Sequence, residues 1–98
     1  MATATHEYVA ERYEPGATEA QIEADAAKLA STTDTMRAAG EQIEFLGTTF
    51  MPSDEASFSW FRSSSPELVE TVHKCAAVPL ERVVLTLSLP HLNNRGRR

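Results

Sequence analysis

Two segments with helical periodicity alternate with four β-type runs, and this order constrains the fold more than any other feature of the chain. The first helical segment carries one apolar stripe, whose members recur three or four residues apart: Ile22, Ala26, Leu29, Thr33 and Met36. A cap at Thr18, with Gln21 three residues later, predicts where this helix begins, and Gly40 predicts its end. Residues 31–34 have weak helix propensity and predict a kink or break.

The second helical segment has two start signals side by side. Ser65 is a favoured N-cap residue, Pro66 suits the first helical position, and Pro79 predicts the end. The apolar face of this helix is formed by Leu68, Val69, Val72 and Ala76. The β-type runs are rich in β-branched and aromatic residues, are mostly bounded by turn residues, and cover 6–14, 42–51, 57–62 and 82–89.

The resulting β-α-β-β-α-β order predicts an α+β fold of the ferredoxin-like type. Two β-α-β halves joined by a hairpin give a four-stranded antiparallel sheet with two helices on one face, and the handedness of the crossovers leaves few rival topologies. At 98 residues the chain is expected to be one domain, 1–98, with its core at about 6–89 and a C-terminal tail at 90–98. A domain this short has a modest core, and dimerisation is a common remedy.

The predicted strands carry bulky apolar residues on both faces. Consecutive strand residues point to opposite sides of a sheet. In five places two consecutive strand residues are both apolar: Tyr8-Val9, Phe45-Leu46, Phe50-Met51, Trp60-Phe61 and Val83-Val84. Two helices cover one face only, which would leave an unusually large apolar patch on a monomer. We therefore expect a homodimer packed sheet to sheet, a dimeric α+β barrel around a central cavity. The alternative is that some pairs lie half exposed at strand ends or bulges.

Charge and cysteine content limit the class of protein. The formal net charge of −5 argues against nucleic acid as a partner, because nucleic-acid binding needs a positive footprint. The basic cluster of Arg95, Arg97 and Arg98 is expected to be a solvated tail, with a polyanion contact as the alternative. With one cysteine, no internal disulfide can form. No apolar run reaches the roughly 20 residues of a membrane span, so we expect no membrane association and a cytoplasmic location.

Glu11 is the first candidate for chemistry. Glu11 and Arg12 are adjacent in the first strand, so one faces the helices and the other the open side of the sheet. The long Arg12 side chain can reach solvent from the helix side, which places Glu11 on the open side with Val9 and Tyr13. A carboxylate inside a barrel needs a partner, a proton or a cation. Glu11 and Tyr13 are therefore catalytic candidates, and the alternative is an ion pair between Glu11 and Arg12 or Arg62 of either subunit.

Other residues of the open side are candidates for ligand binding. Trp60 and Phe61 point to opposite faces, so one of them is expected to line the open side, where an aromatic ring can stack on a flat ligand. The alternative is that both rings belong to the core. The predicted ligand-binding set is Val9, Phe45, Trp60 and Arg62.

The sequence offers weak metal ligands. Glu70 and His73 are three residues apart on the second helix, a spacing at which two side chains can share a cation. Because His73 lies off the apolar stripe, the alternative is an ordinary exposed pair. Cys75 is expected to be a small buried apolar residue.

Four groups of residues form short motifs: Glu11-Arg12 with the Pro15-Gly16 turn, Ile43-Glu44-Phe45-Leu46, Pro66-Glu67, and Val78-Pro79-Leu80-Glu81-Arg82-Val83. Together, over residues 7–89, these motifs resemble a family of small ferredoxin-like domains that includes a nickel-binding protein. The resemblance implies a dimeric α+β barrel and, for some members, a site for nickel or another divalent metal. Where the family often has His, Cys and His, this chain has Gly47, Ser59 and Val72, so the implied ligand set is incomplete.

Three functions fit these features. The first is a small homodimeric protein that binds a small ligand or metal ion at the open sheet face. The second is a cofactor-independent enzyme of the cyclase, isomerase or monooxygenase type, acting on a small organic molecule in the barrel cavity. The third is an accessory or assembly module without a ligand. The aromatic residues and the missing metal-type ligands favour an organic molecule over a metal ion.

Overall fold

The described residues form four strands and two α-helices in the predicted order. The structure, a computed structural model, describes residues 4–90. The strands are β1 (His6–Tyr13), β2 (Ile43–Met51), β3 (Ala56–Ser63) and β4 (Arg82–Thr86), and the helices are α1 (Glu19–Ala38) and α2 (Pro66–Ala76). A short 3-10 turn, η1 (Pro52–Asp54), lies between β2 and β3. The predicted β-α-β-β-α-β order is confirmed.

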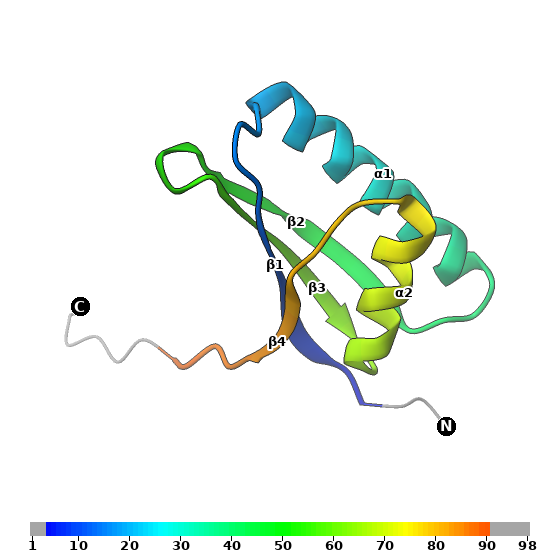
Figure 1. Cartoon of the computed structure of the whole chain (residues 1–98). Helices are drawn as coiled ribbons and strands as arrows, with labels where there is room; N and C mark the ends of the chain where they lie inside the picture. The colour runs from blue at the N-terminus through cyan, green and yellow to red at the C-terminus, as the bar shows by residue number, and fades with distance from the viewer. Residues whose placement is uncertain (1–3, 91–98) are drawn as a thin grey trace.

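The strands make one antiparallel sheet in the order β2-β3-β1-β4. β1 and β3 are central, whereas β2 and β4 are the two edges. Both helices lie on the same face of the sheet, and no helix or strand of residues 4–90 covers the opposite face, hereafter the open face (Figure 1). The architecture is consistent with a ferredoxin-like α+β fold.

Side-chain caps position both helices as the sequence predicts. The Thr18 hydroxyl accepts a hydrogen bond from the Gln21 N–H at 3.2 Å, and the Ser65 hydroxyl accepts one from the Leu68 N–H at 3.3 Å. Each cap satisfies a helical N–H that has no partner within the helix. Gly40 follows the end of α1 with φ +102°, a value that favours glycine.

No break occurs at residues 31–34, one of the two outcomes predicted there, because α1 is one continuous helix from Glu19 to Ala38. The buried Thr33 hydroxyl donates to the carbonyl oxygen of Leu29 at 2.7 Å, one turn earlier. This bond satisfies the hydroxyl without removing the side chain from the core. Burial of the apolar stripe therefore outweighs the weak local propensity.

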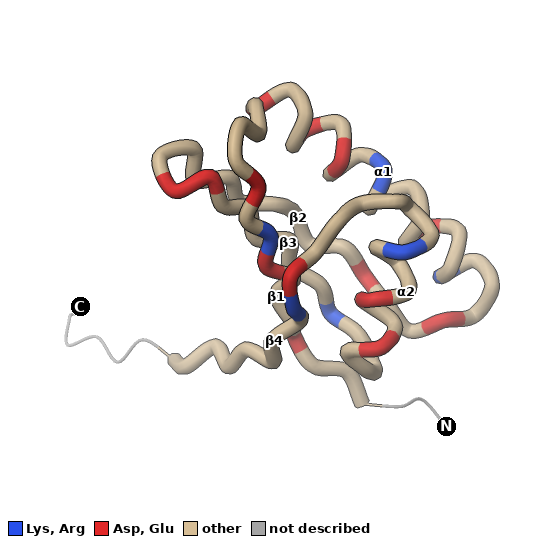
Figure 2. The backbone as a smooth tube through the Cα atoms, in the orientation of Figure 1, with Lys and Arg blue, Asp and Glu red and all other residues tan. Residues whose placement is uncertain are grey.

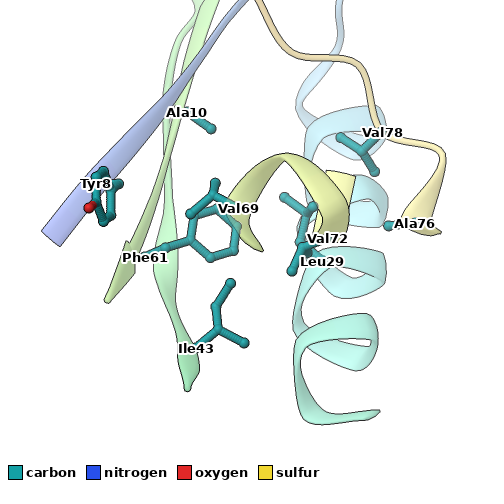
Figure 3. Packing of buried hydrophobic residues seen from close by; sticks show 9 residues of the cluster. All are labelled: Tyr8, Ala10, Leu29, Ile43, Phe61, Val69, Val72, Ala76 and Val78. Carbon is teal, nitrogen blue, oxygen red and sulfur yellow. The ribbon is translucent and has the colours of Figure 1, made fainter. Parts of the chain in front are cut away.

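One apolar core lies between the sheet and the helices. Its largest fully buried apolar members are Phe61 of β3, Leu29 of α1, and Val69 and Val72 of α2. Figure 3 shows these residues converging from the three elements, together with Tyr8, Ala10, Ile43, Ala76 and Val78. Each large apolar side chain buried in this way contributes roughly 1.5–3 kcal/mol. The core therefore fixes which faces of β1 and β3 point to the helices.

A bulge in β2 changes which of its side chains face the helices. Phe45 pairs with Phe61 and Gly47 pairs with Trp60, so Leu46 is an extra residue in the strand. Gly47 has φ +129°, a conformation that glycine adopts readily and other residues rarely adopt. As a result, Phe45 shares the helix side with Phe61, and Gly47 shares the open face with Trp60.

The last strand is shorter than the sequence predicts. The pattern predicts a strand over 82–89, but pairing with β1 ends at Glu7 and Thr86. Residues 87–90 continue past the sheet and run away from the helices (Figure 1). The tail predicted at 90–98 falls mostly on residues 91–98, which lie outside the described part of the chain.

Candidate functional site

Alternation along β1 divides its side chains between the two faces. Ala10 belongs to the core and Arg12 reaches α1, so both face the helices. Val9, Glu11 and Tyr13 occupy the positions between and beyond them and therefore face the open side. The prediction that Glu11 and Arg12 lie on opposite faces is confirmed.

The strand register brings residues of β3 and β4 next to this row. Trp60 pairs with Val9 from one side, and Val84 pairs with Val9 from the other. Arg82 pairs with Glu11. The centre of the open face is thus apolar, with a charged pair at one end.

Glu11 is held by two neighbours. Arg82 Nε donates a hydrogen bond to Glu11 Oε1 at 3.0 Å, and the Tyr13 hydroxyl donates to the same oxygen at 3.3 Å. The Tyr13 ring packs edge to face on Phe58, with 6.3 Å between centroids. Although it lies on the uncovered face, the Glu11 side chain is only 13% exposed. No residue of the range 4–90 donates a hydrogen bond to Glu11 Oε2, which leaves that oxygen as an acceptor.

The charged partners on the open face differ from those predicted. The sequence offers Arg12 or Arg62 as partner for Glu11, but Arg82 takes that role, and the hydrogen bond to Glu11 raises the pKa of Arg82. Arg62 instead binds Glu7 at 3.1 Å and Glu44 at 2.9 Å. These two hydrogen bonds, with Glu7 and then Glu44, raise the pKa of Arg62. Both arginines therefore already have carboxylate partners within one chain.

The predicted ligand-binding set is only partly brought together. Val9, Trp60 and Arg62 share the open face with Glu11. Phe45 does not, because its ring lies 5.3 Å from the ring of buried Phe61 on the helix side. The bulge at Leu46 was not evident from the sequence pattern, and it decides the side on which Phe45 lies.

A second polar cluster lies between the sheet and α1. Arg12 is buried, and its guanidinium donates to Asp25 at 2.7 Å and to Glu14 at 2.6 Å. Burial by itself would lower the pKa of Arg12, but the hydrogen bonds and charges of Glu14 and Asp25 outweigh it and raise that pKa. Arg12 faces the helices as predicted, yet it is tied to two carboxylates rather than reaching solvent.

His73 is buried near this cluster, which makes the expectation of an exposed histidine wrong. It is 4% exposed, and its ring lies 5.7 Å from that of Phe61. Nδ1 is 3.2 Å from the carbonyl oxygen of Val78. A carbonyl only accepts, so Nδ1 carries the proton and the buried Nε2, which has no partner among the described residues, carries the lone pair. Burial lowers the pKa of His73, and the hydrogen bond to Val78 offsets part of that effect.

A small cavity separates His73 from the sheet. Its volume is about 10 Å³, and its polar lining includes Arg12, Thr48, Ser57, Ser59 and His73. The hydroxyls of Thr48 and Ser59 lie 2.9 Å apart. A space of this size holds about one water molecule. The cavity is therefore too small for an organic ligand.

The residues present do not fit a nickel site. His73 is the one imidazole at the cavity. The carboxylate of Asp25 also lines it but is held by Arg12, and Thr48 and Ser59 offer neutral hydroxyls, whereas nickel prefers several imidazole or thiolate ligands. Glu70 is exposed whereas His73 is buried, and no hydrogen bond joins their side chains. Within residues 4–90 no group of three or more His, Cys, Asp or Glu side chains is arranged to hold a metal ion. Cys75 is exposed, so the prediction of a buried cysteine is wrong.

Sequence reasoning missed two residues that organise these clusters, Arg82 and Asp25. Arg82 stands at the start of the last strand, and in a ferredoxin-like sheet that strand lies beside the first, so topology placed it near Glu11. Asp25 precedes Ala26 of the apolar stripe, a position that borders the core. An acidic residue at the border of the core needs a cationic partner, and this need was the sequence signal for its contact with buried Arg12.

Comparisons with protein-family models, with curated proteins and with solved structures found no match to this chain. Among the described residues no helix is long and apolar enough to cross a membrane.

Proposed function

We propose that the protein is a homodimeric α+β barrel that binds a small, flat organic molecule at the open face, between two subunits. One observation carries this proposal: a largely buried carboxylate, that of Glu11, lies beside an apolar aromatic surface. Such a surface with one placed polar group is typical of small-molecule sites.

The second subunit is supported by what the open face exposes. Tyr13, Met51 and Trp60 are large apolar residues with substantial exposure, at 36% even for Trp60 near the centre of the sheet. The charged residues of this face are already paired within the chain, as Glu11 with Arg82 and Arg62 with Glu7 and Glu44. Two copies can thus meet face to face without unpaired like charges, which would otherwise oppose association.

The chemistry of the face favours one class of ligand. The indole of Trp60 offers a surface for stacking, and Glu11 Oε2 offers an acceptor at the end of the apolar centre. A flat ring system that carries an N–H or O–H donor satisfies both. A ligand with a carboxylate at that position would be repelled by Glu11.

The test uses 7-amino-4-methylcoumarin, a flat fluorescent ring with an N–H donor, and coumarin-3-carboxylate as the anionic comparison. Binding is followed by the fluorescence anisotropy of the probe. We expect the aminocoumarin to bind more tightly than the carboxylate, and Trp60→Leu and Glu11→Gln each to weaken it by roughly tenfold. Glu70→Gln, an exposed change on α2, is the matched control and leaves the affinity unchanged.

Two results would overturn the proposal. One is that neither coumarin binds at millimolar concentration, which is the outcome expected of an accessory module. The other is that the aminocoumarin binds the Trp60 and Glu11 variants as well as it binds the wild type. The predicted cofactor-independent enzyme would act at this same open face, between the two subunits, with Glu11 and Tyr13 as its catalytic pair.

A further inference from the structure

An apolar groove lies on the helix side of the sheet, between α1 and the edge strand β2. Its volume is about 250 Å³, and its apolar wall comprises Ile22 and Ala26 of α1 together with Phe45 and Phe50 of β2. Both phenylalanines remain partly exposed. Sites for drug-sized ligands usually measure roughly 300–1,000 Å³, so a groove of this volume suits a smaller molecule of one or two rings.

Two carboxylates form the rim of this groove, those of exposed Glu19 and Glu23 of α1. No ion pair joins either one to another residue of the range 4–90. Lys28, the nearest cationic residue along the helix, is paired with Asp25 at 3.5 Å. The first turn of a helix carries roughly half a positive charge, which two carboxylates outweigh. The rim therefore keeps a net negative charge.

The end of the molecule around the rim is acidic as well. Figure 2 shows acidic positions on the first turns of α1 and on the hairpin between β2 and β3, which contacts the β1–α1 connection through Glu55. The hairpin also carries exposed Asp54. Arg12, the arginine at this end of β1, is already bound by Glu14 and Asp25. A surface of one sign raises the local concentration of ligands of the opposite charge, so the groove favours a cation over an anion.

The aromatic wall favours the same charge. A cation within about 6 Å of the centre of an aromatic ring is attracted by the ring face, and proteins recognise organic ammonium groups in this way. The rings of Phe45 and Phe50 also offer apolar area to the body of a ligand. An uncharged ligand would gain only from the wall, and an anion would be repelled by the rim. A ligand that is both apolar and cationic gains from both features.

We propose that the α1–β2 groove binds an organic ammonium ion of one or two rings, whose apolar body packs on the aromatic wall and whose ammonium group lies at the carboxylate rim. This site is independent of the ligand site proposed on the open face. The groove lies on the helix side of the sheet, whereas Trp60 and Glu11 lie on the other side. Its ligand also differs, because it carries a positive charge and not only a hydrogen-bond donor.

The first experiment compares three probes that share a ring system and differ in charge: 1-naphthylmethylamine, 1-naphthylmethanol and 1-naphthoate. Equilibrium dialysis of the full chain at low ionic strength gives their dissociation constants. We expect the amine to bind roughly tenfold more tightly than the alcohol, and the carboxylate to bind most weakly. Added salt should reduce the difference between amine and alcohol, since it screens the exposed rim. Equal dissociation constants for amine and alcohol would overturn the inference.

The second experiment removes the charge of the rim. In the double variant Glu19→Gln/Glu23→Gln the amine should bind only as well as the alcohol, while the alcohol keeps its wild-type affinity. Both residues are exposed, so the variant is expected to fold. Glu67→Gln/Glu70→Gln, an equal loss of charge on exposed positions of α2, is the matched control and should leave the preference for the amine unchanged. A rim variant that binds the amine as the wild type does contradicts the site.

A third measurement separates this groove from the open face. Trp60→Leu should bind 1-naphthylmethylamine as the wild type does. If it loses the amine, the amine occupies the open face and the inference fails, while the proposed function stands. If instead neither coumarin binds but the amine binds in a manner that depends on the rim, the proposed function fails and the groove site stands.

Discussion

Arg82 of β4 donates its Nε–H to Glu11 of β1 across 3.0 Å, and this contact is the only link between the first and last strands that involves two charged side chains among the described residues. The contact holds Glu11 with one oxygen engaged and the other free. In the proposed site Arg82 would therefore act on a ligand through Glu11, as a positioning residue rather than a binding one.

Arg82→Met should weaken the binding of 7-amino-4-methylcoumarin by about threefold to tenfold, because Glu11 loses the group that orients it. Since Arg82 is exposed, the urea midpoint should hardly change. Arg82→Lys keeps the charge without the Nε–H and should recover only part of the affinity. Wild-type affinity in Arg82→Met, measured by anisotropy, would show that Glu11 needs no positioning.

The buried pair of Arg12 and Asp25 should matter for stability. Arg12→Met leaves Glu14 without its cation and leaves Asp25 with only exposed Lys28, 3.5 Å away, so we expect a loss of about 3 kcal/mol in the free energy of unfolding. Adding Asp25→Leu removes the stranded carboxylate and should recover much of that loss. Urea unfolding of the two variants measures both values. A double variant as unstable as Arg12→Met alone would contradict this account of the pair.

Stability should fall as the pH drops below about 6.5, the ordinary pKa of histidine. Burial lowers the pKa of His73 in the folded chain, so the unfolded chain binds a proton first as the pH falls. The loss therefore begins at the pKa of the unfolded chain and ends at the lower pKa of the folded one. His73→Asn should flatten the dependence of the urea midpoint between pH 7.5 and about 5.5.

His6 provides the control for that pH series, because it is exposed at the start of β1. His6→Asn should keep the wild-type slope. An equal slope in wild type and in His73→Asn would mean that His73 does not set the pH dependence.

Gly47 should resist substitution for a reason confined to the backbone. A Cβ at this position meets nothing within 4 Å, so the cost of Gly47→Ala arises from the φ of +129° and not from a clash. We expect a loss of about 1–3 kcal/mol in the free energy of unfolding. A neutral Gly47→Ala would show that the bulge relaxes into a regular strand, which would also move Phe45 relative to the helices.

The sequence was sufficient for the order of elements and for the faces of the central strands. Caps at Thr18 and Ser65 act locally, and the strict alternation of β1 follows from strand geometry, so Glu11 and Arg12 could be assigned to opposite faces. These features depend on near neighbours in the chain. They required no knowledge of tertiary contacts.

Features that depend on distant contacts were not predictable in the same way. The face of Phe45 depends on one extra residue in the pairing of β2 with β3. The burial of His73 depends on how the segment after α2 turns back, with Val78 accepting from its Nδ1. The partner of Glu11 depends on the register of β4 against β1. In each case a neighbour remote in sequence decides the outcome.

Sedimentation equilibrium of the wild-type chain tests most directly whether the open face is buried between two copies. If two copies bury Trp60 and Glu11 face to face, the chain will sediment with twice its monomer mass at micromolar concentration. Trp60→Glu, which places a charge at the centre of that face, will shift it to the monomer. A wild-type chain that sediments as a monomer at tens of micromolar would contradict the shared barrel and the ligand site built on it.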